Sequence, residues 1–257
     1  DMNWVAELMV KFDILGLRTL SVIYDVCKRL DFDLNSINLD DKKLYKSLSN
    51  EFRHPQGLFQ IEAYTNFSVC KKIKPRNLEE LSAVVAIARP GALEFAGEYS
   101  EYVKTGDFQS IHPAFDEILD YTGGIPLYQE QLMKMAVRVG FTLDEAEQLR
   151  RIVGKKKVDQ MPAWKEKIFE KVEENRLTNA WTGHRGEEAA DVLWQVAEDS
   201  ANYSFNKSHS IAYATLAAWT TYLKFKYPKE FFLSLLKMTQ FEPAPHEEIA
   251  KITTELP

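Results

Sequence analysis

The sequence predicts a mainly α-helical fold that carries one strand near its N-terminus. Apolar residues recur every three or four positions through most of the chain, which is the spacing that buries one face of a helix. Glycine and proline separate these segments, and a single early run, residues 8–15, has the length and apolar character of a strand. The 45% apolar and 27% charged residues are typical of a globular protein and exclude a disordered chain.

The predicted strand places two charged residues on one face. Lys11 and Asp13 are two positions apart, and residues at that spacing point to the same side of a strand. A lone strand is not stable without a sheet to join. Because the first residue is also Asp1 and not an initiator methionine, we expect the chain to be a piece of a larger protein.

The remaining segments are predicted to be helices joined by turns. They cover residues 19–30, 40–48, 78–88, 128–139, 142–153, 162–175, 187–201, 208–226, 229–238 and the start of the tail 243–257. Asp40 is expected to cap the second of them, and Thr142 with Glu145 forms a capping-box pattern at the fifth. Residues 55–57 predict a turn, and 57–62 predict either a short extended piece or the start of a helix.

The charge of the chain is unevenly distributed. The net charge is −6, which argues against a nucleic-acid partner if it is evenly spread. However, residues 134–171 and 202–229 each carry +4, which leaves −14 on the rest. These two windows predict either a local phosphate-binding surface or a pair of solvated helix faces, and both interpretations stay open.

The cysteines and the hydropathy exclude several classes of protein. Cys27 and Cys70 are the only cysteines, so no disulfide framework holds the fold and a reducing compartment fits. No cysteine and histidine spacing is typical of a zinc site. No apolar run is long enough to cross a bilayer.

Three acidic residues are candidates for metal binding. Asp13 lies in an apolar strand, where a carboxylate either faces water at a sheet edge or binds a hard cation such as Mg²⁺. Asp31 and Asp33 have the spacing of a carboxylate pair, but they lie in a polar connector between helices. We interpret them as part of a solvated turn.

Two basic segments are candidates for phosphate binding. Arg150 and Arg151 end a capped helix, and the lysines of residues 155–157 follow Gly154. The segment 205–209, FNKSH, opens a long helix whose first turn is expected to present free backbone N–H groups to phosphate. Taken alone, these residues fit either a nucleotide-binding or nucleic-acid-binding domain of a phosphoryl-transfer enzyme, or a non-enzymatic helical scaffold.

Six motifs occur in one order along most of the chain. They are KFDILGL (11–17), GLFQIE (57–62), RPG (89–91), YQEQ (128–131), LRR (149–151) with GKK (154–156), and FNKSH (205–209). In this order and at this spacing they resemble the C-family of bacterial replicative DNA polymerases, the polymerase III alpha subunits. Departures at Ala92, at residues 121–124 and at 152–153 suggest a divergent member, encoded by a bacterium or a phage and acting in the cytoplasm.

The resemblance implies a domain organisation. Residues 1–19 would be the C-terminal piece of an α/β palm, residues 20–240 a helical fingers domain, and residues 241–257 the start of the segment that leads to a helix-hairpin-helix DNA-binding region. The fold class is therefore mainly α, with one N-terminal strand that belongs to an incomplete palm.

The resemblance also implies the site residues. Asp13 would be catalytic and would bind two Mg²⁺ ions together with carboxylates outside this chain. The residues implied to bind the nucleotide are Lys11, Arg150, Arg151, Lys155, Lys156, Asn206, Lys207, Ser208 and His209. Asp31 and Asp33 have no role in this scheme.

The implied function is templated nucleotidyl transfer by a DNA-directed DNA polymerase. The implied partners are primer–template DNA, a dNTP, the other polymerase domains or a chain that carries the remaining carboxylate pair, and a sliding clamp, with no membrane. Without that carboxylate pair, we expect the chain alone to be inactive. A non-catalytic nucleic-acid-binding or scaffold module derived from such a polymerase is the alternative.

Overall fold

The computed structural model describes residues 16–155, 157, 159–175 and 186–255, and within them it contains helices and no sheet. The α-helices are α2 (Arg18–Leu30), α3 (Lys42–Lys46), α4 (Tyr64–Ile73), α5 (Leu78–Ile87), α6 (Ala96–Thr105), α7 (Asp116–Leu119), α8 (Gln129–Arg138), α9 (Leu143–Gly154), α10 (Met161–Glu174), α11 (Gly186–Tyr203), α12 (Lys207–Lys226), α13 (Pro228–Met238) and α14 (Pro245–Thr253). The short turns are η1 (Leu34–Ser36), the π-helical η2 (Ser47–Glu51), η3 (Leu93–Phe95), η4 (Pro113–Phe115), η5 (Asp120–Thr122) and η7 (Thr239–Phe241).

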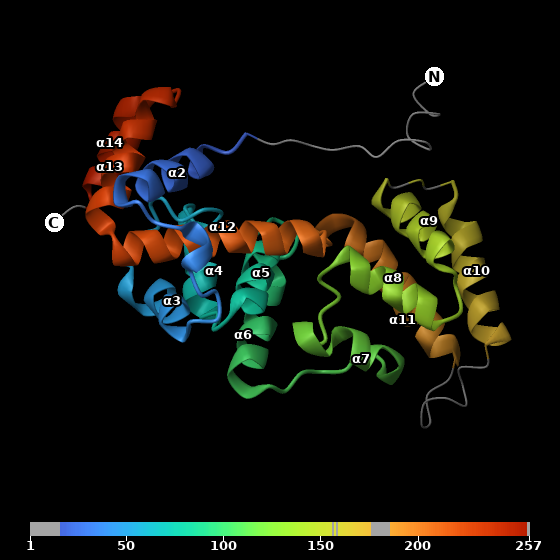
Figure 1. The fold of residues 1–257 in the computed structure, drawn as a ribbon. Coiled ribbons are helices and arrows are strands. Elements are labelled where there is room, and N and C mark those ends of the chain that lie inside the picture. The colour runs from blue at the N-terminus through green and yellow to red at the C-terminus, as the bar shows by residue number, and fades with distance from the viewer. Residues whose placement is uncertain (1–15, 156, 158, 176–185, 256–257) are drawn as a thin grey trace, which may run out of the picture.

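The helices form two lobes (Figure 1). In the first lobe, α3 to α6 pack around α12, while α2 and α13 bury a second apolar cluster against another face of α12. The second lobe is built from α7 to α11 around its own core. The chain leaves the first lobe after α6, completes the second lobe with α11, and returns along α12. Residues far apart in the sequence therefore meet where α12 begins.

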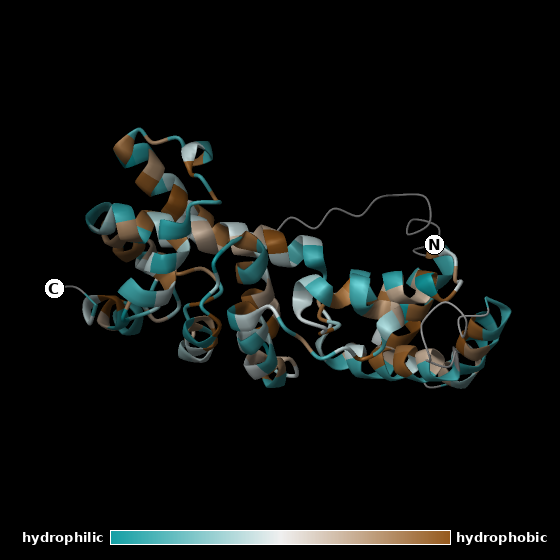
Figure 2. Cartoon of the chain, turned by 90° about the horizontal axis from the view of Figure 1, so that it is seen from below, coloured by the Kyte–Doolittle hydropathy of each residue, from teal (hydrophilic) through white to brown (hydrophobic). Residues whose placement is uncertain are grey.

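Helix α12 is the central element of the first lobe. Small side chains at Ala214, Ala217 and Ala218 are fully buried and allow α5 to approach closely. The Ser210 hydroxyl donates a hydrogen bond to the Ser82 carbonyl of α5 at 2.7 Å. Figure 2 shows brown hydrophobic and teal hydrophilic stretches alternating along the helices, as expected when each helix buries one face.

Most predicted helices are confirmed within a few residues at their ends. The capping box of Thr142 and Glu145 is present at α9, and Pro228 occupies the first turn of α13. The helix α14 is confirmed in the tail. These helices carry strong local start signals, so their sequence alone determines where they begin.

Other expectations about the first lobe were wrong. Asp41, not Asp40, caps α3 by accepting a hydrogen bond from the Lys43 N–H, and α3 continues after Lys46 as the π-helical turn η2. Residues 57–62 are neither extended nor helical, but form successive turns that begin at Gly57 with a φ of 79°. The predicted strand, residues 8–15, lies outside the described residues.

The four-residue helix α7 was not predicted, nor were the two longer helices α4 and α6. Neither has a side-chain hydrogen bond at its N-cap, and α6 begins directly after the short turn η3. Their buried faces, which include Phe67, Cys70 and Tyr99, pack against each other and against α5. Tertiary packing therefore specifies these helices more than local sequence does.

We predict that Ala217→Leu lowers the free energy of unfolding by about 1–3 kcal/mol, because the added atoms have no space between α12 and α5. Ala212→Leu, at an exposed position of the same helix, is the matched control and should change stability by less than about 0.5 kcal/mol. Urea denaturation followed by circular dichroism measures both. Equal effects of the two substitutions would show that α12 is not tightly packed there.

Candidate functional site

The candidate site lies where the N-terminal ends of α8 and α12 meet. The backbones of Tyr128 and Phe205 form an isolated parallel β-bridge. The Gln129 N–H donates to the Phe205 carbonyl at 2.9 Å, and the Phe205 N–H donates to the Leu127 carbonyl at 3.2 Å. Thus the YQEQ and FNKSH segments, far apart in the sequence, lie side by side.

A single carboxylate joins these two helix ends. Glu130 Oε1 accepts a hydrogen bond from Asn206 Nδ2 at 2.8 Å, and its Oε2 accepts one from the Lys207 backbone N–H at 3.0 Å. The Asn206 side chain in turn accepts the His209 N–H at 2.9 Å. The expectation that the first turn of α12 presents free N–H groups is therefore wrong for Lys207 and His209, because the protein supplies their acceptors.

The Lys207 ammonium group is held by charge and by aromatic rings. Its Nζ lies 3.0 Å from Glu79 Oε1 of α5 and 4.1 Å from the centre of the Tyr121 ring. Tyr121 stacks on Tyr128, whose hydroxyl lies 3.1 Å from Ser82 Oγ. Burial raises the pKa of Tyr128, so this phenol is neutral at physiological pH. The cation therefore has a defined position above neutral rings.

Arg89 is a site residue that the sequence did not single out as a ligand. Its guanidinium group lies 4.0 Å from the centre of the Phe205 ring and donates to the carbonyls of Tyr203 and Ala86. Burial lowers the pKa of this arginine. The RPG motif at residues 89–91 was the sequence signal that could have identified Arg89 as a site residue. Arg89 fixes the backbone that leads into α12.

The arginine pair of α9 lies beside the same junction of α8 and α12, which Arg150 contacts directly. Arg150 donates to Gln129 Oε1 at 3.4 Å, and its Nη2 and Nε bond to Glu147 at 2.6 and 2.7 Å. The Arg151 Nε lies 2.8 Å from the same carboxylate. Arg150, followed by Arg151, holds the pKa of Glu147 at about 2. Residues 129 and 130 thus connect α9, α8 and α12.

The other residues implied to bind the nucleotide lie on the first turn of α12, at the end of α9 or outside the described residues. His209 lies between two aromatic rings, 5.3 Å from Phe205 and 3.9 Å from Tyr213 by ring centres. Ser208 is exposed on the first turn of α12, and Lys155 is exposed at the end of α9. Lys11, Asp13 and Lys156 lie outside the described residues.

Several cations of the two basic windows are buried or paired with carboxylates. Lys224 is buried, donates to the carbonyls of His54 and Gln56, and lies 2.7 Å from Glu255. Lys226 is at the opposite end of α12 from Lys207, about 28 Å away at the helical rise per residue. In the other window, Lys167 pairs with a carboxylate, as do all three arginines.

The acidic residues of the connector behave as the sequence predicted. Asp31 ends α2 with a φ of 47°, and Asp33 accepts the Asn35 N–H, so both belong to an exposed turn. Within the described ranges, no group of three or more acidic, histidine or cysteine side chains could hold a metal ion. No helix in those same ranges has the length and apolarity needed to span a membrane.

The described residues thus form a helical, two-lobed fold whose helix junction carries a cation in a defined position. The family profile described as bacterial DNA polymerase III alpha subunit finger domain matches residues 19–176. The chain belongs to this family.

Curated relatives agree over a longer stretch. The DNA polymerase III subunit alpha of Thermus aquaticus is 36% identical over 94% of this chain, and that of Aquifex aeolicus is 37% identical over 90%. The same subunit of Halalkalibacterium halodurans is 32% identical over 94% of the chain. The chain spans about a fifth of the length of these relatives, since it covers 20% or 21% of each.

We predict that the contribution of Glu147 to stability depends on pH. A lowered carboxyl pKa stabilises the folded state above the unfolded pKa of about 4.3, and this contribution is lost as the pH falls toward 2. Glu147→Gln should therefore cost about 1 kcal/mol at pH 7 and progressively less below pH 5. Urea denaturation of both proteins between pH 7 and pH 3 measures the difference.

Glu166→Gln, at an exposed position of α10, is the control and should change the stability by less than about 0.5 kcal/mol at pH 7. A Glu147→Gln effect that stays constant over the same range would contradict the paired state of this carboxylate.

Proposed function

We propose that the chain is the fingers part of a replicative DNA-directed DNA polymerase and that the candidate site binds the incoming dNTP and the end of the primer–template. The observation that supports this most directly is the junction at Gln129 and Glu130. It joins the Arg150 side chain of α9 to Gln129 and the Lys207 backbone N–H of α12 to Glu130, while the Lys207 ammonium group lies beside Glu79 of α5. Guanidinium and ammonium groups are suited to binding phosphate oxygens.

A phosphate that binds at this site competes with carboxylates of the chain for the same cations. Glu147 holds both arginines, and Glu79 holds Lys207. A triphosphate carries more negative charge than either carboxylate, so it can attract these cations without a change in the backbone. Arg151 keeps 65% of its side chain exposed and is the most accessible of the three. Arg150 is proposed to orient the phosphate, because its remaining donors lie next to Gln129.

The catalytic part of the proposal concerns Asp13. We propose that its carboxylate binds Mg²⁺ and that the other metal-binding carboxylates lie on the remaining polymerase domains or on a partner chain. Two bound Mg²⁺ ions would activate the primer 3′-hydroxyl and stabilise the leaving pyrophosphate. The described residues would contribute phosphate binding and orientation. A sliding clamp would bind through a segment outside this chain.

We predict that Lys207→Ala weakens primer–template binding about three- to tenfold at low salt and reduces the salt dependence of binding by about one phosphate contact. Fluorescence anisotropy with a labelled duplex measures the affinity, and a thermal melt verifies folding. Lys28→Ala, at an exposed position of α2, is the matched control and should change the affinity less than twofold. Equal losses in both variants would contradict the proposed site.

We predict that the chain alone extends no primer, and that extension appears when the domains carrying the other carboxylates are supplied in trans. Asp13→Asn should then abolish extension, because asparagine lacks the charge that Mg²⁺ requires. Asp33→Asn is the control and should retain full extension, since asparagine preserves the turn. Primer extension on a gel reports all three. DNA binding without extension in the complemented mixture would favour the non-catalytic module.

A further inference from the structure

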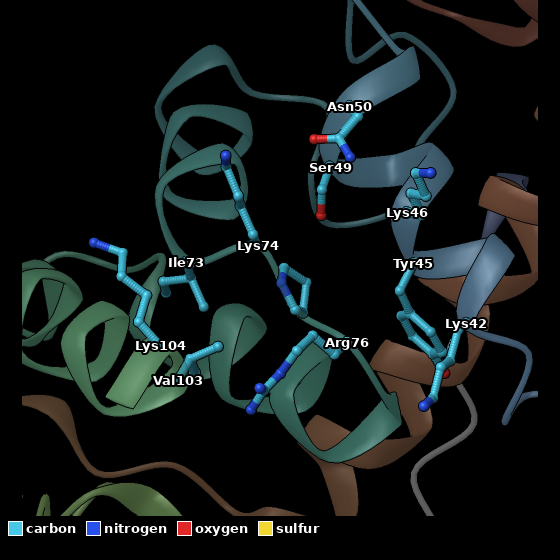
Figure 3. A pocket seen from close by; sticks show the side chains of 11 residues that line it. Lys42, Tyr45, Lys46, Ser49, Asn50, Ile73, Lys74, Arg76, Val103 and Lys104 are labelled. Carbon is cyan, nitrogen blue, oxygen red and sulfur yellow. The ribbon is translucent and has the colours of Figure 1, made fainter. Parts of the chain in front are cut away.

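A second cationic site lies in the first lobe, away from the junction of α8 and α12. It is a pocket of about 470 Å³ between α3, η2, the end of α4 and α6 (Figure 3). Its lining contains five basic residues and no acidic one, in a chain whose net charge is −6. They are Lys42, Lys46, Lys74, Arg76 and Lys104. None of them belongs to the candidate site described above.

Three of these cations are not neutralised by the described chain. Lys42, Lys46 and Lys74 form no ion pair with any described carboxylate. Arg76 and Lys104 have partners outside the lining, Glu80 and Glu101. The pocket therefore carries a local excess of positive charge that a bound anion would offset.

A buried hydroxyl points into the same pocket. Ser49 is 7% exposed, and its Oγ has no hydrogen-bond partner among the described residues. Figure 3 shows this hydroxyl directed into the space bordered by Lys74 and Tyr45. Buried polar groups are nearly always hydrogen-bonded, so an unpartnered donor in a pocket points to a ligand that supplies the acceptor.

The backbone around the pocket is also unusual. Ser49 and Asn50 lie in the π-helical turn η2, a rare conformation that is frequent at functional sites. Lys74 ends α4 with a left-handed φ of 56°, which a residue with a Cβ adopts at a cost. This conformation turns the chain so that Lys74 and Arg76 border the same cavity.

The floor of the pocket is apolar. Ile73 and Val103 are buried, and the Tyr45 ring is fixed because its hydroxyl donates to the Leu39 carbonyl at 2.5 Å. An apolar floor beneath a cationic rim suits a ligand with a flat apolar part and a compact anion, and the volume is typical of small-ligand sites. These are the properties of a nucleotide.

We propose that this pocket binds a phosphate-bearing nucleotide, with the phosphate at Lys46, Lys74 and the Ser49 hydroxyl and the base in the apolar part of the pocket. The nucleotide is either a free nucleoside triphosphate or one unit of a DNA single strand, which share this chemistry. The site is separate from the proposed polymerase site and does not depend on it.

The first test compares two double variants with the same change in charge. Lys46→Glu/Lys74→Glu removes two pocket cations, whereas Lys43→Glu/Lys72→Glu changes exposed lysines on the same two helices that do not line the pocket. Affinities for labelled oligo(dT), for a fluorescent nucleoside triphosphate and for a glutamate-rich peptide are measured by anisotropy. We expect at least a tenfold loss for one phosphate ligand in the pocket variant and less than twofold in the control.

The ligand that shows the loss identifies the source of the phosphate. Equal losses in both variants, no binding of either phosphate ligand, or loss confined to the acidic peptide would overturn the proposal. A Lys207→Ala protein serves in the same assay to separate the two sites, because its pocket is intact.

The second test does not require a charge reversal. Ser49→Ala should leave the melting temperature unchanged or raised, since it removes an unpartnered buried hydroxyl, and should weaken phosphate binding about threefold. In the unsubstituted protein, the ligand should protect Lys46 and Lys74 from acetylation, as read by mass spectrometry, and should not protect Lys43 or Lys72. Unchanged affinity in Ser49→Ala together with uniform acetylation would refute the site.

Discussion

The carboxylate of Glu130 is the contact on which the arrangement of the candidate site depends. It accepts hydrogen bonds from the side chain of Asn206 and from the backbone of Lys207, across 76 and 77 positions of sequence. A negative group at the start of a helix is favoured by the helix dipole and by the unpaired N–H groups there. Glu130 supplies that charge to α12 from the first turn of α8. It therefore fixes how the returning helix meets the second lobe.

The other contacts of the site follow from this junction. The β-bridge aligns Phe205 with Tyr128, and Arg89 then stacks on the Phe205 ring. Gln129, next to Glu130, accepts a hydrogen bond from Arg150 at the end of α9. If α12 began at another angle, Lys207 would not lie above the Tyr121 ring and beside Glu79. The position of each cation is thus a consequence of how two lobes are joined.

The helix junction and the pocket of the first lobe differ in how their cations are neutralised. At the α8 and α12 junction, the cations of Arg150, Arg151 and Lys207 are matched by carboxylates, so the site is closer to neutral than its sequence indicates. In the first lobe, by contrast, the cations around Ser49 face a pocket without lining carboxylates. Net charge over a window of sequence cannot distinguish these cases, because the neutralising acids come from other segments.

The sequence predicts those parts of the fold that local interactions determine. The capping box at Thr142 and the proline at residue 228 mark helix starts that the structure confirms. It does not predict α4, α6 and α7, which lack capping side chains, or the choice of Asp41 over Asp40 as a cap. The bridging role of Glu130 and the burial of Lys224 depend on partners far away in the chain. No periodicity or spacing encodes such pairs.

A double-mutant cycle between Glu130 and Asn206 tests this account most directly. Glu130→Gln, Asn206→Ala and the double variant are unfolded in urea, and the coupling free energy is obtained from the four stabilities. A charge-assisted hydrogen bond that fixes α12 predicts a coupling of about 1 kcal/mol or more. A coupling below about 0.3 kcal/mol would show that the two helix ends are held by other contacts and that Glu130 does not organise the site.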